Sequence, residues 1–248
     1  MTNTRLLGAA FMALAATCGV AHAQQGSVGV SFQSTDAGGI DVDTTSLNGS
    51  VLLGENFQFN GRYSDLEGEA DGWGIDAFVF SRNDRYGYGA FAGYSTIDVF
   101  DADEWSIGGF GQLYSGNSTW TAQLGYSDTE GDVQVIHLDG EGRFFLTENL
   151  SVQGNLGYGD LDSDFGGTDY WTGGIGAEWL IPGAAVSING GWQHLDADGF
   201  EVDSLGVGVR WNFGGGSLLE RNRSGASLRR VTPTAVELEF VGGGYVPR

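Results

Sequence analysis

The stretch that decides the fold is LSVQGNLGY, residues 150–158, because its side chains alternate between two kinds. Apolar side chains stand at positions 150, 152, 156 and 158, and polar side chains stand at 151, 153 and 155. A period of two is typical of a β-strand whose two faces meet different surroundings. The same pattern recurs from residue 28 to VGVRWNF, residues 207–213, so the sequence predicts an all-β protein of many strands.

Two kinds of connection separate these predicted strands. Five short turns are centred near residues 55, 84, 117, 148 and 183. Six longer, acidic loops alternate with them and cover residues 34–43, 65–71, 98–104, 128–132, 160–169 and 196–203. Short turns at one end and longer loops at the other are typical of transmembrane β-barrels. The sequence therefore predicts a single antiparallel barrel of about twelve strands over residues 24–213.

The tryptophans indicate which face of the sheet meets lipid. All seven share the apolar parity and lie near one or the other end of a predicted strand, as membrane-interface aromatics do. They are Trp73, Trp105, Trp171 and Trp192 beside the long loops, and Trp120, Trp179 and Trp211 near the tight turns. A tryptophan-rich core of a soluble sandwich is the alternative, but such a core would not sort tryptophan to both strand ends.

Composition excludes several other classes. The 248 residues include 44 Gly, 3 Pro and no Lys, and the net charge is −21. Such a charge argues against a nucleic-acid partner, which needs clustered cations to bind phosphate. Beyond the N-terminal region, no segment approaches the ~20 apolar residues that a membrane-spanning helix needs.

The N-terminus reads as a secretory signal peptide covering residues 1–23. Arg5 precedes an apolar run over 6–20, and Ala21-His22-Ala23 fits the A-x-A cleavage pattern. Cys18 lies inside this segment, so the mature chain is expected to contain neither a disulfide nor a cysteine metal site.

On these patterns the chain resembles the bacterial outer-membrane β-barrel family, and more loosely the porins, over about residues 26–213. Residues 207–213 are similar to the closing strand of that family, which ends in an aromatic residue and is read by the outer-membrane assembly machinery. The resemblance implies a place in the bacterial outer membrane, with the bilayer and that machinery as partners. It also implies periplasmic turns and extracellular loops. Here 35 residues follow Phe213, which departs from the family pattern.

Negative charge is concentrated in the predicted loops. Residues 24–213 hold 29 Asp and Glu against 5 Arg, and 22 of those acids lie in the long loops, which contain no Arg. Such a rim would attract cations and hold divalent ions loosely. A solvated surface without selectivity is the alternative reading. We expect no dedicated metal site, since the acidic run from Asp160 lacks the glycine and glutamate spacing of a calcium loop.

Charged residues that share the inward parity are the predicted pore lining. Either they form a charged constriction along a pore, or they pair as interior salt bridges that hold the barrel shut. They are Arg62, Asp76, His137, Asp139, Glu141, Arg143, Glu178 and Arg210.

The sequence predicts a channel for passive passage of small solutes, with a preference for cations. A structural or adhesive barrel with a closed lumen is the second hypothesis. An enzyme is the third and weakest, because His137 and His194 fit no Ser/His/Asp arrangement. We expect no cofactor. Residues 214–248 are expected to form a flexible periplasmic tail, and a basic plug that enters the barrel is the alternative.

Overall fold

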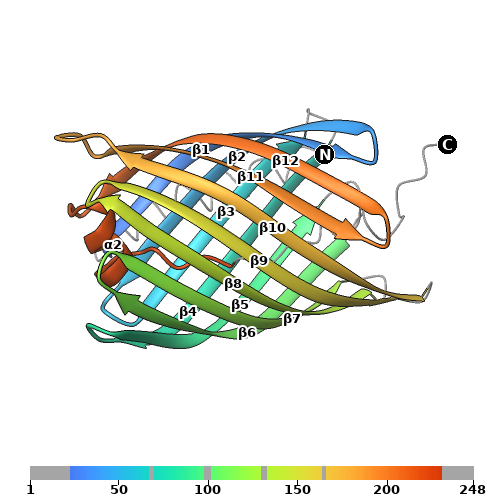
Figure 1. Cartoon of the computed structure of the whole chain (residues 1–248), viewed down its shortest axis with the longest axis horizontal. Helices are drawn as coiled ribbons and strands as arrows, with labels where there is room; N and C mark the ends of the chain where they lie inside the picture. The colour runs from blue at the N-terminus through green and yellow to red at the C-terminus, as the bar shows by residue number, and fades with distance from the viewer. Residues whose placement is uncertain (1–22, 67–69, 98–101, 130–132, 164–165, 231–248) are drawn as a thin grey trace.

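The computed structural model describes residues 23–66, 70–97, 102–129, 133–163 and 166–230. Twelve antiparallel strands, each paired with its neighbours in sequence, form a closed barrel (Figure 1). The prediction of a single antiparallel barrel of about twelve strands is confirmed. The strands are β1 (Ala23–Ala37), β2 (Ile40–Leu53), β3 (Phe57–Leu66), β4 (Ala70–Arg82), β5 (Tyr86–Ile97), β6 (Ala102–Ser115), β7 (Ser118–Thr129), β8 (Val133–Thr147), β9 (Leu150–Ser163), β10 (Gly166–Leu180), β11 (Val186–Ala197) and β12 (Phe200–Phe213).

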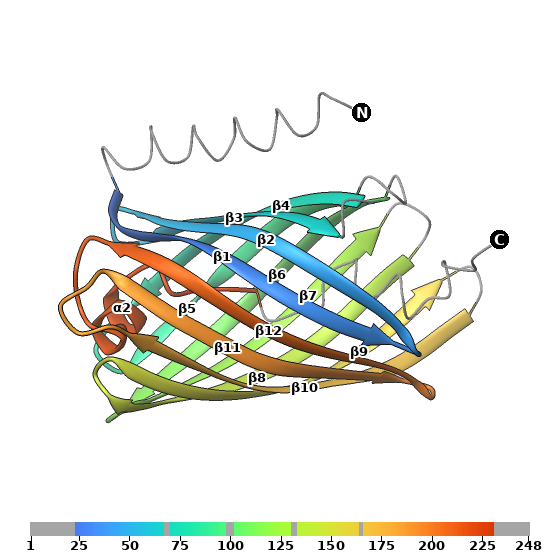
Figure 2. The ribbon, with the colours of Figure 1, turned by 90° about the horizontal axis from the view of Figure 1, so that it is seen from above.

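The first and last strands close the sheet. β1 pairs with β12 from Gly26 opposite Phe213 to Ala37 opposite Val202, and β1 pairs with β2 on its other side. These strands lie side by side and run obliquely to the long axis of the barrel (Figure 2). Because both edges are paired, the sheet presents no open row of backbone donors and acceptors to lipid.

Burial along the strands is inverted relative to a soluble protein. On β8, the apolar residues Ile136 and Leu138 are each 57% exposed, whereas His137 and Asp139 are 1% and 3% exposed. Most apolar side chains of the strand thus face outward and its polar ones face the interior, as expected where the outside is hydrocarbon. Val135 and Phe145 are exceptions, because they lie in buried clusters near the two ends of the strand. This arrangement excludes the soluble-sandwich alternative.

Two of the predicted long loops are instead tight hairpins. β1 and β2 are joined by Gly38 and Gly39, and β11 and β12 are joined by Asp198 and Gly199. All four residues have positive φ, which is the geometry of the two-residue turn that best matches strand twist. The loop lengths expected at 34–43 and 196–203 were therefore wrong. The loop expected at 160–169 was too long as well, because β9 runs to Ser163 and β10 begins at Gly166. Their acids alternate with strand-forming residues, and side chains beyond the membrane can be acidic without ending the strand.

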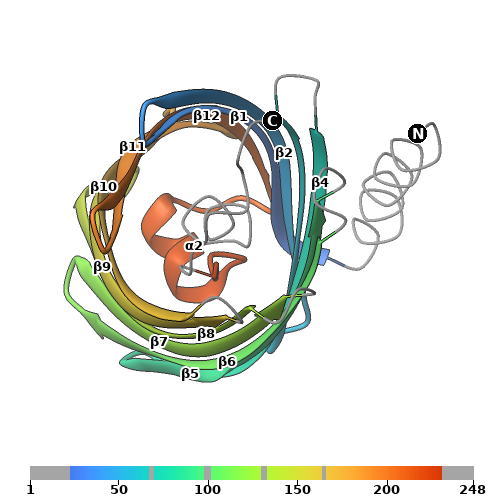
Figure 3. The same cartoon turned by 90° about the vertical axis from the view of Figure 1, so that its right-hand side faces the viewer.

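The barrel has two distinct ends. At the acidic end lie the hairpins at 38–39 and 198–199 and the Asp- and Glu-rich strand ends. At the opposite end, which we call the tail end, lie the turns near 55, 84, 117, 148 and 183. A single described helix, α2 (Leu218–Ser224), lies within the ring of strands at the tail end (Figure 3). Among the described residues, no helix has the length and apolar character needed to cross a membrane.

The turn at Gly199 offers a test of the hairpin geometry. Its φ of +87° is one that residues with a side chain rarely adopt, so Gly199→Ala should destabilise the barrel by about 1–2 kcal/mol. Gly111→Ala is the matched control, because Gly111 has ordinary φ and a Cβ added there would meet no atom within 4 Å. The urea midpoint of the refolded protein in detergent measures both changes. Equal midpoints for the two variants would contradict the assigned turn.

Candidate functional site

The chain after β12 turns back into the lumen. Gly214, Gly215 and Gly216 all have positive φ and reverse its direction. Helix α2 then starts with a capping box, in which the Ser217 hydroxyl accepts from the Glu220 backbone and the Glu220 carboxylate accepts from the Ser217 backbone. Both bonds satisfy donors that a helix start leaves free. Residues 214–230 therefore lie against the barrel wall, and residues 231–248 of the expected tail lie outside the described residues.

The base of this segment, residues 217–224, is held mainly by arginines that donate to backbone carbonyls. Arg221 donates to the carbonyl of Gly26 at 2.7 Å, and Arg223 donates to those of Gly116 and Ser118 at 2.9 and 3.0 Å. From the wall, Arg82 donates to the carbonyls of residues 223 and 225. These acceptors are uncharged, so the base is anchored without ion pairs.

Apolar contacts complete the anchorage of the base. Leu218 packs with Phe145 and Leu180 in a small buried cluster at the tail end. The Asn222 side chain accepts a 2.5 Å hydrogen bond from the Thr119 hydroxyl, and both residues are buried. The base therefore fills part of the tail-end mouth with contacts of the kind found in a protein core.

The tip of the segment, residues 225–230, runs on along the lumen wall. The Leu228 side chain is 6% exposed. It lies in an apolar cluster with five wall residues, which are Leu52, Phe78, Phe80, Phe91 and Phe110. The neighbouring glycines make room for these rings, because a Cβ atom at Gly108 would overlap the Phe91 ring. The tip covers this apolar patch. A second buried apolar cluster lies near the acidic end, and it includes Val135, Leu161 and Tyr170.

Three carboxamides of the wall bind the tip backbone. Gln58, which is fully buried, accepts from the Leu228 N–H at 3.1 Å and donates to its carbonyl at 2.6 Å. Asn60 donates to the same carbonyl at 3.1 Å, and Gln123 donates to the carbonyl of Arg229 at 2.7 Å. The backbone of the tip is thus paired with the wall by side chains, as it would be paired by another strand.

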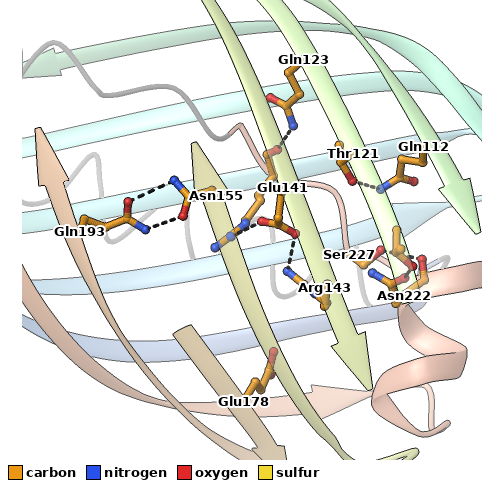
Figure 4. A network of polar contacts seen from close by, with 12 residues as sticks. Gln112, Thr121, Gln123, Glu141, Arg143, Asn155, Glu178, Gln193, Asn222 and Ser227 are labelled. Carbon is orange, nitrogen blue, oxygen red and sulfur yellow. Dashed lines mark hydrogen bonds and ion pairs between the residues drawn. The ribbon is translucent and has the colours of Figure 1, made fainter. Parts of the chain in front are cut away.

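The tip ends in two arginines that meet wall carboxylates. Arg229 pairs with Glu141, which also lies 3.3 Å from Arg143 (Figure 4). Arg230 lies 2.6 Å from Glu104 and 3.5 Å from Asp76. Because Glu104 is 1% exposed and the Arg230 side chain is 7% exposed, each charge depends on the other for compensation in place of water.

Five of the predicted pore-lining residues border one cavity. Arg62, Asp76, Arg143, Glu178 and Arg210 line a space of about 540 Å³ that lies beside the tip and is also bordered by Leu228 and Arg229. Carboxamides complete much of its wall, among them Asn155 and Gln193, which bond to each other over Gly174 of β10 (Figure 4). The lumen therefore keeps a space on the side of the wall that the tip does not cover.

The remaining predicted residues are in the wall of β8. His137, Asp139 and Glu141 are 1%, 3% and 9% exposed, and His137 Nε2 lies 3.9 Å from Asp139 Oδ2. His194 contacts Asp203 on the outer face at 3.1 Å and stacks on Trp192. The two histidines thus lie on opposite faces of the barrel wall. In the part of the chain that is described, no group of three or more His, Cys, Asp or Glu is arranged to hold a metal ion.

The tryptophans lie on the outside of the barrel. Six of them, all except Trp73, are between 41% and 55% exposed. Trp73 is half-buried against Tyr94, with ring centroids 5.4 Å apart. Similar aromatic contacts join Trp105 to Tyr126 and Trp171 to Tyr158 near the acidic end. Their role at a membrane interface stays a prediction.

Sequence reasoning missed several residues of the site. Glu104 was placed in a long loop, although it shares the inward parity of Ser106 on β6 and contacts Arg230. The inward phenylalanines of β4 to β6 were hidden by strands that mix glycine and aromatic residues on both faces. The helix start had a readable signal, since Ser217 followed by Glu220 is a capping-box pattern.

Solved structures with a similar fold are bacterial outer-membrane proteins. The KdgM porin in complex with disordered oligogalacturonate matches with a TM-score of 0.60 at 10% identity, over 75% of this chain and 99% of that chain. The NanC porin matches with a TM-score of 0.60 at 9% identity, over 74% of this chain and 98% of that chain. The translocator domain of autotransporter NalP from Neisseria meningitidis matches with a TM-score of 0.52 at 12% identity, over 76% and 88% respectively.

The similarity is therefore one of fold: this chain has the barrel architecture of bacterial outer-membrane porins. No protein-family profile matches the chain. No curated protein matches it either.

The ion pairs of Arg230 predict a large effect of one substitution. Arg230→Ala would leave the buried Glu104 without its cation, which should reduce the stability of the folded barrel by about 3–5 kcal/mol. Adding Glu104→Gln should restore part of that loss, because the neutral amide needs no compensating charge. The urea midpoint in detergent measures both effects.

Arg85→Ala serves as the matched control, since it removes the same charge from an exposed turn at the tail end. A midpoint for Arg230→Ala that equals the midpoint of this control would show that the ion pair does not stabilise the barrel.

Proposed function

We propose that this chain is an outer-membrane porin-like channel for passive passage of small solutes, narrowed by its own C-terminal segment. The observation that carries the proposal is the cavity of about 540 Å³, lined by polar and apolar side chains, that remains beside the tip inside a closed barrel. Charged and carboxamide side chains line it, and such a wall suits water and hydrophilic solutes. The porin fold supports the proposal at the level of architecture.

We place the acidic end outside the cell and the tail end in the periplasm. Barrels of this kind keep their termini and short turns on the periplasmic side, and the tail of this chain enters at the end that bears the described turns. The outward tryptophans would then lie at the two membrane interfaces. The aromatic end of β12 supports recognition by the assembly machinery.

We further propose that the channel prefers cations. In the middle of the lumen, the described charges balance: Arg62, Arg143, Arg210, Arg229 and Arg230 face Asp76, Glu104, Asp139, Glu141 and Glu178. The acidic strand ends and loops, which contain no Arg, therefore make the potential negative. Carboxylates at an entrance raise the local concentration of cations, and the same groups would bind divalent ions loosely.

A closed structural barrel is the second candidate, and the covered apolar patch around Leu228 favours it. Single-channel recording in planar bilayers distinguishes the two. Stable conductance steps from refolded wild-type protein support the channel. A protein that inserts but yields no conductance above the bare bilayer overturns the channel and leaves the structural barrel.

The cation preference predicts a salt-dependent reversal potential. The preference should be marked at 0.01 M salt and should shrink towards 1 M, because the Debye length falls from about 30 Å to about 3 Å over that range. Neutralising Asp160, Asp162 and Asp169 to asparagine should reduce it at low salt. Reversal potentials under a KCl gradient measure the preference.

The control neutralises Glu55 and Asp84, two exposed acids in turns at the tail end. This double variant should change the preference less than the triple one. Selectivity for anions at 0.01 M salt would overturn the proposed preference.

A further inference from the structure

The lumen wall recognises the tip residue by residue, in the manner of a peptide receptor. We propose that the wall formed by β2 to β8 is a binding site for a peptide with one apolar residue followed by two arginines. Residues 226–230, Ala-Ser-Leu-Arg-Arg, are its tethered ligand. We call the wall residues that contact them the tip site. They are Leu52, Gln58, Asn60, Asp76, Phe78, Phe80, Phe91, Glu104, Ser106, Phe110, Gln123 and Glu141.

The tip site binds backbone groups of the peptide, and these contacts do not depend on which side chains the peptide carries. Gln58 binds both the N–H and the carbonyl of Leu228, and it is fully buried in doing so. Gln123 binds the next carbonyl along and is 4% exposed. Buried carboxamides are costly without partners, and the backbone groups of Leu228 and Arg229 supply partners to these two side chains.

The apolar patch selects the first side chain. Aromatic rings from β4, β5 and β6 converge on Leu228 and form an apolar cluster separate from the ones at the two ends of the barrel. Without an occupant, these rings would face lumen water. Burial of a leucine side chain in such a pocket is favourable because it removes apolar surface of both partners from water. The patch therefore provides affinity for an apolar residue at this position.

The carboxylates select the two cations that follow. Glu141 pairs with Arg229, while Glu104 and Asp76 both lie within 3.5 Å of Arg230. Ser106 accepts a further 2.6 Å hydrogen bond from Arg230. The Arg230 position is also kept open by Gly93, because a Cβ atom there would lie 2.5 Å from Asp76 Oδ1 and 2.7 Å from Ser106 Oγ.

The proposal requires the tip to exchange while the base stays in place. Most of their contacts differ, although the Ser227 hydroxyl of the tip donates to the Asn222 carbonyl of the base at 3.1 Å. The base is held by carbonyl acceptors and by the cluster around Leu218. The tip is held by the tip site, and Gly225 joins the two. A tether of this kind gives the tip a high effective concentration, of millimolar order for short linkers. The wild-type site is therefore occupied by its own ligand.

The test uses full-length protein in detergent and a dye-labelled peptide with the sequence of residues 226–230. The site is vacated in the variant Leu228→Ser, Arg229→Ser, Arg230→Ser. Fluorescence anisotropy should show this variant binding the peptide at least about tenfold more tightly than wild type, because the tethered competitor is gone. A scrambled peptide of the same composition should bind at least about tenfold more weakly than the correct sequence.

Specificity of the site is checked by adding Glu104→Gln and Glu141→Gln to the vacated variant. Both changes remove the charge that the arginines recognise, so peptide affinity should fall by about tenfold or more. Arg85→Ser in the wild-type background is the matched control for loss of a cation. It should bind the peptide no better than wild type. Should the triple variant fail to refold, Arg229→Ser, Arg230→Ser carries the same comparison.

Equal binding of the correct and scrambled peptides, or equal binding by the vacated variant and wild type, would overturn the proposal. The assay does not depend on conductance. Peptide binding by a protein that never conducts would keep the tip site and remove the proposed channel. Conductance by a protein that does not bind the peptide would keep the proposed channel and remove the tip site.

Discussion

The pairing of β1 with β12 is the interaction on which the rest of the structure depends. Hydrocarbon offers no partner to a backbone N–H or carbonyl, so an open edge in a membrane would leave a row of unsatisfied groups. The register from Gly26 opposite Phe213 to Ala37 opposite Val202 removes both edges at once. Closure also separates an outer face from a lumen, and every later feature follows from that separation. Ile136 and Leu138 can be exposed because their face of the sheet meets lipid. His137 and Asp139 can be buried because their face is turned to the lumen.

The lumen is divided by the segment that follows β12. Its base and its tip use arginine in different ways. Arg221 and Arg223 donate to carbonyls and so hold the helix by directional hydrogen bonds, whereas Arg229 and Arg230 meet carboxylates and balance buried charge. The planar guanidinium suits both tasks, which explains how a chain with no lysine can hold residues 217–230 against the wall.

The wall is correspondingly built in two parts. Where the tip lies, the inner face has the character of a protein core, with Phe78, Phe91 and Phe110 packed around Leu228. Where the cavity lies, the inner face has carboxamides and paired charges such as Arg210 with Glu178. One side of the lumen therefore gains stability from burial, and the other keeps the polar surface that passage of a solute requires. The Asp and Glu residues of the acidic end add negative charge at the entrance to both parts of the lumen.

The sequence by itself determined the barrel, its strand number, its outward face and most of its inward charges. These features repeat with a period of two, and each strand carries its own evidence, as residues 150–158 do. Tertiary structure alone decided what those inward charges meet. Glu104 and Arg230 are 126 positions apart, and no local pattern relates them. The same holds for Leu228 and the rings of β4 to β6, which became a pocket only when the sheet curved around the segment that returns from β12. The alternation of side chains along a strand is a local property that can be seen in the sequence. Which residues meet across the lumen is decided only when the sheet closes into a barrel.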